Sequence, residues 1–498
     1  MEKRAMITKI VKKIGCGIFC FVCIIAIMCL FAVPWLNYYI DSISIDSLMF
    51  YAGMGLDHGN LSVVWDCLQT VGIPTVLLTC LVVFLVLLNK RKHWISDSVL
   101  QRVGLIGGCL ICLISGVVVV KGLHVKEFLN NTLNDSQLIE QEYVDPSGVE
   151  VQFPEKKRNL IYIFLESMES SYMDVSNGGC FSENYIPELT KLCQQNTNFS
   201  DTSGVGGYHM ITGSDYTTAG IFAQTSGLPL KIPFELNEYE YGSFMPGVTS
   251  LGEILQKEGY HNYFTIGSDK KFGGRSNYLE EHGDYTIFDY QSAIDAGKIS
   301  SDYKVWWGYE DEKLFEYAKE QLSEISKKDA PFNYTLLTVD THFPDGYQCK
   351  LCEDQFSDQY ANVLACSSRQ VYEFVKWIQK QDFYKNTSII ICGDHQTRQK
   401  QFVPSEKSED RRVFNVFINS AVSTEHTKNR EVTAMDMFPT TLAALGVKIP
   451  GERLGIGTNL FSDVPTLAEE MGWDKFKEEV EKKSIFYNDT FYNIKNRH

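Results

Sequence analysis

Side chains that can bind metal ions follow three short apolar runs in the C-terminal part of the chain. They are Glu166 after Asn159–Leu165, Asp340, Thr341 and His342 after Phe332–Val339, and Asp394 and His395 after Ser388–Cys392. One polar residue at the end of an apolar run is usually a turn or capping residue. Three such positions together favour a metal or phosphate site, because carboxylates and imidazoles suit divalent cations with mixed oxygen and nitrogen coordination.

A hydroxyl-rich segment supplies candidate nucleophiles for chemistry at such a site. Residues Ser203–Gly220 are rich in Gly, Ser and Thr and pass into an apolar segment. A loop that enters a helix N-terminus offers unpaired N–H groups and a positive dipole end, which favour a phosphoryl group. A metal-bound hydroxyl is also deprotonated more readily than a free one. The candidate attacking hydroxyls, which could equally be helix caps, are Thr212, Ser214, Thr217 and Thr218.

The elements that would position these residues alternate between strands and helices. Strands are predicted at Asn159–Leu165, His261–Ile266, Phe332–Val339 and Ser388–Cys392. Helices are predicted at Ser250–Glu258, Glu310–Ile325 and Ser367–Gln381. This alternation predicts an α/β fold with a mostly parallel central sheet. Ligands of such sheets gather beyond the carboxyl ends of the strands, where the polar residues named above would lie.

The charge of the chain is divided unevenly between two parts. The 498 residues carry a net charge of −16, which argues against a nucleic-acid partner because such binding depends largely on Lys and Arg. Residues 1–125 have ten Lys and Arg against six Asp and Glu, a net of +4, which leaves −20 for the remainder. The hydrophobic fraction of 44% and charged fraction of 22% exclude a disordered chain and a wholly membrane-embedded transporter.

Three uncharged apolar runs predict a membrane anchor in the first part. Ile14–Leu36, Val71–Leu88 and Val103–Val120 are each long enough to cross a bilayer as a helix. The first run is too long for a cleaved signal peptide and lacks a small-residue cleavage site. Lys and Arg precede the first run and lie between the second and third, whereas residues 37–70 have none. The positive-inside rule then predicts a cytoplasmic N-terminus and an external location after about residue 123.

These observations predict four segments. They are a membrane anchor with three transmembrane helices at residues 1–123, a polar linker at 124–158, an extracytoplasmic catalytic α/β domain at 159–463, and a charged, aromatic and helical C-terminal appendage at 464–498. The lipid bilayer is therefore an expected partner of the chain.

The cysteines outside the apolar runs leave two alternatives open. They are Cys180, Cys193, Cys349, Cys352, Cys366 and Cys392. An oxidising compartment would permit disulfides, for which Cys349 with Cys352 and Cys180 with Cys193 are the candidate pairs. A zinc site on Cys349 and Cys352 would need two more ligands, and Cys366 is the nearby candidate.

Several motifs, taken in order, resemble those of the phosphoglycerol transferases. The motifs are Leu165-Glu166-Ser167, Tyr216–Gly220, Trp307-Gly308 with Asp311, Asp340–Gly346, Gly393–His395, Met435–Thr441 and Arg453–Gly457. This family includes the lipoteichoic acid synthases and the transferase that modifies periplasmic glucans, within the alkaline phosphatase and sulfatase superfamily. The resemblance spans Asn159–Phe461 and is closest to the glucan-modifying branch, through the Asp340–Gly346 segment.

The resemblance implies a sulfatase/alkaline-phosphatase-like domain with one divalent cation, manganese first, with magnesium or zinc also compatible. It implies that Glu166, Asp394 and His395 are metal ligands and that Thr217 is the fourth ligand and the nucleophile, because Thr217 stands two residues before Ala219 as in the family.

The resemblance also implies the residues that bind the substrate. His342 would contact the substrate phosphate or the leaving alkoxide, and Arg275 would hold the phosphoglycerol. The lipoteichoic acid synthases have a Trp near this Arg, where the present chain has Gly273 and Gly274.

The function implied is transfer of phosphoglycerol from phosphatidylglycerol, through a threonine intermediate, to an envelope glycan or polymer. The location implied is a bacterial plasma (inner) membrane, with a multi-pass anchor and a periplasmic or extracellular catalytic domain. Two alternatives remain at this point. One is a membrane-tethered metal-dependent phosphodiesterase or another hydrolase of the superfamily, and the other is a non-catalytic sensor or scaffold that keeps the fold.

Overall fold

The computed structural model describes residues 2–39, 61–231 and 243–492. The chain divides into two compact units, Met1–Leu133 and Asn134–His498, which are treated separately below.

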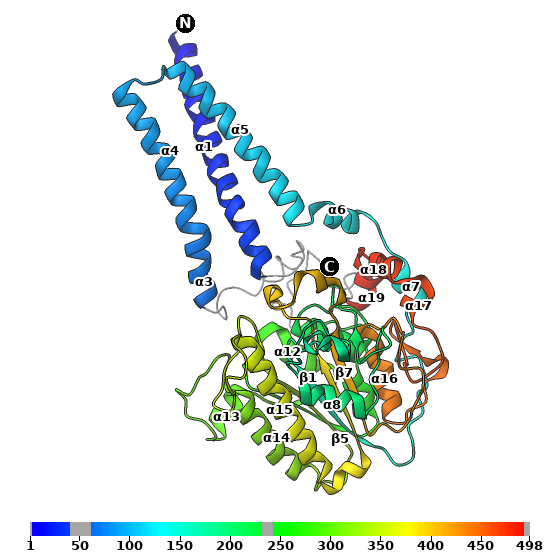
Figure 1. Ribbon diagram of the computed structural model, residues 1–498. Helices are drawn as coiled ribbons and strands as arrows, with labels where there is room; N and C mark the ends of the chain where they lie inside the picture. Colours follow the sequence, from blue (N-terminus) through cyan, green and yellow to red (C-terminus); the bar gives the residue numbers. More distant parts are fainter. Residues whose placement is uncertain (1, 40–60, 232–242, 493–498) are drawn as a thin grey trace. The chain divides into compact units, whose positions relative to one another are not determined.

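The described part of the first unit consists of helices, three of them long and apolar (Figure 1). They are α1 (Glu2–Tyr39), α3 (Leu61–Cys67), a short π-helix (Leu68–Gly72), α4 (Ile73–Lys92), α5 (Asp97–Gly122) and α6 (Val125–Leu133). Three stretches of these helices, Lys13–Tyr38, Val64–Lys92 and Asp97–Gly122, are long and apolar enough to cross a membrane. The three predicted apolar spans are thus confirmed as helices. Residues 40–60 of the predicted external loop lie outside the described residues.

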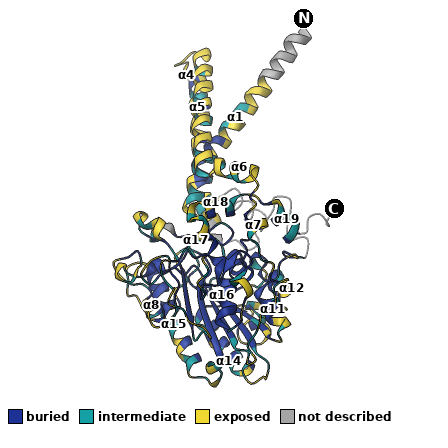
Figure 2. Cartoon of the chain, turned by 90° about the vertical axis from the view of Figure 1, so that its right-hand side faces the viewer, coloured by how far each residue is buried: buried dark blue, intermediate teal, exposed yellow. Residues whose placement is uncertain are grey.

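Most apolar residues on these helices are exposed, and the ribbons of α4 and α5 are accordingly mostly yellow in Figure 2. Phe21, Leu77 and Leu113 are examples, each with more than half of its surface exposed. An apolar surface of this extent is typical of helices that contact lipid rather than water.

The second unit is organised around one sheet, whose strands within the described residues are ordered β2-β7-β6-β1-β5-β3-β4. The strands are β1 (Asn159–Leu165), β2 (Gly207–Tyr208), β3 (His261–Ile266), β4 (Thr286–Phe288), β5 (Phe332–Leu337), β6 (Thr387–Gly393) and β7 (Val413–Ile418). The pairings among β6, β1, β5, β3 and β4 are parallel, whereas β7 pairs antiparallel with both β6 and β2. A separate two-stranded ribbon is formed by β8 (Arg453–Leu454) and β9 (Gly457–Thr458).

The predicted α/β fold with a mostly parallel sheet is confirmed, and β1 and β3 have the predicted bounds. The third predicted strand ends two residues early, at Leu337. The reason is that the Asp311 carboxylate accepts hydrogen bonds from the backbone N–H groups of Val339 and Asp340. The antiparallel strand β7 was not predicted, although its run of apolar residues could have identified it as a strand.

Helices cover both faces of the sheet, and alternate residues of β1 pack into two separate cores. Leu160, Tyr162 and Phe164 belong to one hydrophobic cluster, and Ile161, Ile163 and Leu165 belong to the other. This alternation follows from the two-residue period of a strand. Figure 2 shows the sheet as a buried layer.

The first cluster is covered by α9 (Thr217–Ser226), α11 (Leu251–Lys257), α12 (Arg275–Glu281) and α16 (Met437–Ala444). The second cluster is covered by α8 (Pro187–Gln195), α13 (Tyr290–Asp295), α14 (Asp311–Ile325) and α15 (Gln359–Gln379).

Two of the predicted helices match well, and one begins much earlier than predicted. α11 and α14 lie within a residue of the predicted bounds. α15 begins at Gln359 rather than Ser367, because the Asp358 side chain caps the helix by accepting hydrogen bonds from the N–H groups of Tyr360 and Ala361.

Residues on either side of the α/β core are integrated into the second unit. Residues 134–158, expected to be a linker, include α7 (Leu138–Glu142), whose Leu138 and Ile139 are buried in the first hydrophobic cluster. The C-terminal segment forms α17 (Leu467–Met471), α18 (Trp473–Glu481) and α19 (Ile485–Phe491), and its aromatic residues enter the same cluster. Ser136 donates a hydrogen bond to the Glu479 carboxylate at 2.7 Å, so the two segments also contact each other.

Candidate active site

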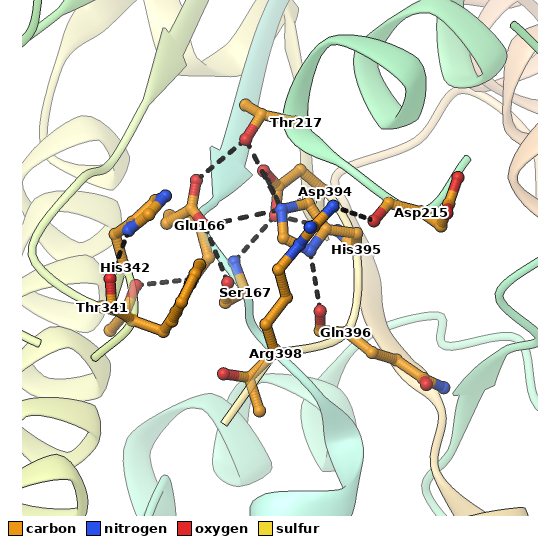
Figure 3. A network of polar contacts seen from close by, with 12 residues as sticks. Glu166, Ser167, Asp215, Thr217, Thr341, His342, Asp394, His395, Gln396 and Arg398 are labelled. Atoms are coloured by element: carbon orange, nitrogen blue, oxygen red, sulfur yellow. Dashed lines mark hydrogen bonds and ion pairs between the residues drawn. The ribbon is translucent and has the colours of Figure 1, made fainter. Parts of the chain in front are cut away.

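Three of the predicted metal ligands meet at the carboxyl ends of β1 and β6. These strands are neighbours, and their register places Leu165 opposite Gly393. The residues that follow, Glu166 and Asp394, therefore emerge side by side, with His395 next in the chain (Figure 3). One ligand atom from each of these three buried residues lies within 4.8 Å of the others.

The His395 ring is oriented so that one nitrogen faces the two carboxylates. Nδ1 lies 2.7 Å from the Gln396 carbonyl oxygen, which can only accept a hydrogen bond, so Nδ1 carries the proton. Burial lowers the pKa of His395, which favours the neutral ring. The lone pair of Nε2 then points toward Glu166 Oε1 at 3.5 Å and Asp394 Oδ2 at 3.4 Å. This is the tautomer that a metal-binding histidine requires.

Asp394 contributes a carboxylate oxygen that has no hydrogen-bond partner among the described residues. Its Oδ1 accepts hydrogen bonds from the N–H groups of Ser167 and His395, whereas the buried Oδ2 accepts none. Burial, and then the charge of Glu166, raise the pKa of Asp394 well above its ordinary value. A divalent cation would satisfy this oxygen and neutralise both carboxylates, so the residues present fit such an ion.

Glu166 connects the metal ligands to the candidate nucleophile. Its Oε1 accepts a hydrogen bond from the Ser167 hydroxyl at 2.7 Å, and its Oε2 accepts one from Thr217 Oγ1 at 3.2 Å. Burial alone would raise the pKa of Glu166, but its interactions with His342 and His395 and the hydrogen bond that it accepts from Ser167 outweigh burial, and the pKa is lowered. Glu166 is therefore ionised and able to bind a cation.

Thr217 stands at the first position of α9, with its hydroxyl in the ligand cluster. Thr217 Oγ1 lies 3.4 Å from His395 Nε2, in addition to its contact with Glu166. Gly220 allows this approach, because a Cβ there would come within 2.1 Å of the Asp394 carbonyl oxygen. The helix N-terminus adds N–H groups and a positive dipole end beside the hydroxyl.

The other three candidate hydroxyls have partners elsewhere. Thr218 Oγ1 donates to the Gly273 carbonyl oxygen at 2.8 Å, and Ser214 Oγ donates to the Ile211 carbonyl oxygen at 2.8 Å. Thr212 hydrogen-bonds with Glu481. Among these four hydroxyls, Thr217 is therefore the one in contact with the metal-ligand cluster.

His342 lies beside Glu166, on the loop that follows β5 (Figure 3). Its Nδ1 donates a hydrogen bond to the Phe343 carbonyl oxygen at 2.6 Å, and burial lowers its pKa. The neutral ring therefore has an Nε2 lone pair that can accept a proton.

Asp340, which the strand-end pattern grouped with the potential ligands, lies outside the ligand cluster. Its Oδ2 accepts a hydrogen bond from the Asp311 N–H at 3.1 Å, while the Asp311 carboxylate accepts from the N–H groups of Val339 and Asp340. Burial raises the pKa of Asp311 to about 7 and that of Asp340 well above its ordinary value. This reciprocal clamp fixes the backbone two residues before His342.

Arg275 is buried at the first position of α12. Its guanidinium donates hydrogen bonds to Ser268 Oγ at 3.0 Å and to the Asp269 carbonyl oxygen at 2.9 Å, and it lies over the Phe272 ring. The preceding Gly273 and Gly274 both have a positive φ, and a Cβ on Gly273 would come within 2.6 Å of Thr218 Oγ1. These glycines therefore serve the contact between the Arg275 loop and α9.

The structure adds two residues to the site, Trp307 and Arg398, to which the sequence analysis assigned no role there. Trp307 contacts the rings of His342 and Phe272, with centroid distances of 4.8 and 5.4 Å, so a tryptophan from another loop lies beside the Arg275 segment. Its buried indole N–H has no hydrogen-bond partner among the described residues. Arg398 is nine-tenths buried and donates to the Asp215 carbonyl oxygen at 3.4 Å (Figure 3). Arg398 follows Asp394 by four residues, and this closeness in sequence could have identified it as a candidate site residue.

A buried ion pair fixes the loop that carries His395 and Arg398. Arg411 binds the Glu169 carboxylate with two nitrogens, at 2.6 and 3.0 Å. Glu169 also accepts a hydrogen bond from the Thr397 N–H, and Arg411 donates one to the Thr397 carbonyl oxygen. Both side chains are almost fully buried, so each depends on the other for its charge balance.

The fold is that of a sulfatase-type domain. A family profile described as Sulfatase matches residues 158–447, which is more than half of the chain. The chain therefore belongs to the sulfatase family, and the predicted family resemblance is confirmed.

Curated relatives share the name phosphoglycerol transferase I. One from Citrobacter koseri is 34% identical over 263 residues, which cover 51% of this chain and 32% of the relative. One from Escherichia coli is 30% identical over 328 residues, covering 64% of this chain and 41% of the relative. The chain thus spans about a third to two fifths of the length of these relatives.

Two solved structures share the fold. The lipoteichoic acid synthase LtaP from Listeria monocytogenes aligns with a TM-score of 0.52 and 17% identity, covering 72% of this chain and 98% of that one. A protein in the alkaline phosphatase superfamily from Vibrio parahaemolyticus aligns with a TM-score of 0.50 and 21% identity, covering 67% of this chain and 79% of that one.

Proposed function

We propose that this protein is a membrane-anchored, metal-dependent phosphoglycerol transferase. It would move phosphoglycerol from phosphatidylglycerol to a hydroxyl of an envelope glycan or polymer. The observation that carries the proposal is the contact of Thr217 Oγ1 with Glu166 and His395 at the start of a buried helix. The relatives named phosphoglycerol transferase I support the choice of the transferred group.

The cation would be held by Glu166, Asp394 and His395, with Thr217 Oγ1 as the fourth donor. Three oxygen donors and one imidazole suit manganese, which we propose as the resident ion. When bound, such an ion lowers the pKa of a coordinated hydroxyl and polarises a phosphoryl oxygen. The Nδ1–H bond of His395 to Gln396 and the two N–H bonds to Asp394 Oδ1 keep the ligands in place before substrate arrives.

In the first step, Thr217 Oγ1 attacks the phosphorus of the donor lipid. The Oγ1–P bond forms, the bond from phosphorus to the diacylglycerol oxygen breaks, and the hydroxyl proton of Thr217 leaves with diacylglycerol. Phosphoglycerol remains esterified to Thr217. Charge on the phosphoryl oxygens would be stabilised by Arg275, Arg398 and the N-terminus of α9.

In the second step, an acceptor hydroxyl attacks the same phosphorus. Its oxygen–phosphorus bond forms, the Thr217 Oγ1–P bond breaks, and the proton released by the acceptor ends on Thr217 Oγ1, which regenerates the hydroxyl. His342 suits the role of proton acceptor for this hydroxyl, because its Nδ1 is already bound to the Phe343 carbonyl oxygen and its Nε2 lone pair is available. The indole N–H of Trp307, next to His342, would donate a hydrogen bond to the glycerol or phosphate oxygens.

The apolar helices support a lipid as donor, because an enzyme anchored in a bilayer meets its lipid substrate at the membrane surface. The basic residues before the first span and at residues 90–102 support a cytoplasmic N-terminus and a catalytic unit on the outer face. We therefore propose a multi-pass protein of the bacterial plasma membrane with an external catalytic domain.

To test this proposal, full-length protein is incubated with manganese, a candidate glycan and phosphatidylglycerol that carries a label in its phosphoglycerol group. The measurement is where the label goes. We expect label on the glycan and an equal amount of diacylglycerol. Thr217→Ala should abolish both, whereas the matched variant Thr218→Ala should retain them, because Thr218 binds the Gly273 carbonyl oxygen instead. Label that appears only as free glycerol phosphate, with every acceptor tried, would contradict the transferase and favour a phosphodiesterase.

A further inference from the structure

Three cysteines of the second unit converge at a place separate from the candidate active site. Cys349 and Cys352 lie in the loop that follows β5, and Cys366 lies on α15. The Cys349 sulfur is 3.7 Å from that of Cys352 and 3.8 Å from that of Cys366, and all three sulfurs lie within 4.8 Å of one another. Cys349 and Cys366 are buried, and Cys352 is partly exposed.

These distances match the edges of a tetrahedral metal–thiolate site. Two sulfurs that are each about 2.3 Å from a common tetrahedral metal ion lie about 3.8 Å apart. A disulfide would instead bring two sulfurs to about 2.05 Å and exclude the third. Cys349 is nearly equidistant from both of its neighbours, and the sulfurs of Cys352 and Cys366 also lie within 4.8 Å of each other, so the three sulfurs can surround one ion.

The surroundings supply hydrogen-bond donors to the sulfurs. Backbone N–H groups of Leu351 and Cys352 interact with the Cys349 sulfur. Gln370, one turn after Cys366 on α15, directs its side-chain nitrogen at the sulfurs of Cys366 and Cys349, at 3.5 and 3.9 Å. Donors of this kind stabilise the negative charge of thiolates and orient them around a metal.

A positively charged side chain, that of Arg369, is also close to the three cysteines. Arg369 donates a hydrogen bond to the Leu351 carbonyl oxygen at 2.8 Å, and its charge acts on Cys366. Three thiolates and one Zn²⁺ carry a net charge of −1, which this guanidinium would balance. The contact also ties the turn between Cys349 and Cys352 to α15.

We propose that Cys349, Cys352 and Cys366 bind one zinc ion as a structural site, with a water molecule at the fourth position on the partly exposed side. Thiolate ligands select zinc over the harder cations that suit the carboxylates of the active site. The ion would fasten the loop after β5 to α15. Since this same loop carries Asp340 and His342, the zinc would hold one wall of the active site in place.

The experiment measures metal content in full-length protein purified in detergent without added metal or chelator. We expect about one zinc per chain in the wild type, and loss of that zinc in Cys349→Ser and Cys366→Ser. Cys180→Ser is the matched control, because Cys180 is a buried free cysteine outside the cluster. Glu166→Ala should also retain the sulfur-bound zinc, which separates this site from the candidate active site.

A second measurement does not depend on whether the cysteine variants fold. Cobalt-substituted wild-type protein should have an intense sulfur-to-cobalt charge-transfer absorption, which oxygen and nitrogen ligands alone do not produce. Alkylation of unreduced protein followed by peptide mass spectrometry should find the three thiols protected until zinc is removed. Absence of zinc together with a disulfide joining any two of these cysteines would overturn the proposal, as would zinc that remains in both cluster variants.

Discussion

Thr217 and Thr218 are adjacent at the start of α9, yet their hydroxyls have unrelated partners. Thr217 Oγ1 contacts Glu166 Oε2 at 3.2 Å and His395 Nε2 at 3.4 Å, whereas Thr218 Oγ1 donates to the Gly273 carbonyl oxygen at 2.8 Å. One side chain thus lies among candidate metal ligands, and the other joins α9 to the loop that precedes Arg275. This difference assigns different roles to two residues of the same type.

The first prediction concerns the hydroxyl of Thr217. Thr217→Ser keeps the oxygen and should retain measurable release of diacylglycerol from phosphatidylglycerol, while Thr217→Ala should lower the rate by at least about 10³-fold because the nucleophile is absent. Release of diacylglycerol under identical conditions is the measurement. Equal rates for the Ser and Ala variants would show that the hydroxyl takes no part in the reaction.

The second prediction concerns cation binding. Manganese should raise the melting temperature of the wild type, because an ion that binds only the folded state at 100 times its Kd adds about 2.7 kcal/mol of stability. Asp394→Asn should lose most of this rise, since it weakens the carboxylate oxygen of the ligand cluster that has no hydrogen-bond partner among the described residues. Asp340→Asn is the matched control, because Asp340 contacts Asp311 instead of the cluster. A manganese effect of the same size in all three proteins would contradict the assigned ligands.

The third prediction is a pH dependence of stability at Asp311. Burial raises the pKa of this carboxyl from 3.8 to about 7, so the folded state binds the proton more tightly than the unfolded state. The stabilisation from the proton is complete at low pH and is lost as the pH rises toward 7, with a slope of at most about 1.4 kcal/mol per pH unit for one proton.

The variant Asp311→Asn cannot ionise at this position, so its melting temperature should fall less between pH 4.5 and pH 7.5. Its stability at low pH should be lower than that of the wild type, because one amide oxygen replaces two acceptors for the N–H groups of Val339 and Asp340. Melting curves of both proteins over this pH range are the check. Parallel pH profiles would exclude Asp311 as the titrating group.

The fourth prediction concerns Arg398. Arg398→Gln should lower kcat/KM by about 10²-fold or more, because a buried cation near the transferred phosphoryl group would be lost. Arg158→Gln is the control, because Arg158 binds backbone oxygens of Thr387 and Asn419 at the opposite end of β6. Initial rates of diacylglycerol release over a range of phosphatidylglycerol concentrations give the values. An unchanged kcat/KM in Arg398→Gln would remove this residue from the site.

The fifth prediction concerns the buried pair of Glu169 and Arg411. Glu169→Gln should lower the free energy of unfolding by about 3–5 kcal/mol, since it leaves the Arg411 charge without its partner. Adding Arg411→Met should restore part of that loss, because no buried charge then remains. Chemical denaturation of the two variants and the wild type measures both effects. If the two substitutions acted independently, the double variant would have a lower free energy of unfolding than Glu169→Gln. That result would contradict the coupling of the two residues.

The strands and part of the site were predictable because they depend on local patterns. The apolar run before Glu166 and the one before Asp394 predicted strands of a mostly parallel sheet, so their carboxylates were expected at the same edge of the sheet. The structure adds that these two strands are neighbours. The position of Trp307 was not predictable in this way. Trp307 reaches His342 and Phe272 through the packing of loops that are distant in sequence, and no period or spacing encodes such a contact.

Local sequence rules could not distinguish Thr217 from Thr218 either, because both are possible caps and both stand where α9 begins. The family resemblance indicated Thr217, and the geometry adds a physical reason. Gly220 lets α9 approach the Asp394 backbone, and this approach turns the first residue of the helix toward the ligands. The end of β5 was misjudged for a similar reason, since the side chain of Asp311 replaces the strand hydrogen bonds at Val339.

The most direct test of the account is to find the transferred group on the protein. Wild-type protein is mixed with manganese and phosphatidylglycerol in the absence of acceptor, quenched in acid and digested for peptide mass spectrometry. We predict a phosphoglycerol adduct on Thr217, formed with an equal amount of diacylglycerol in the first turnover. An adduct on another residue, or continued release of diacylglycerol by Thr217→Ala, would contradict it.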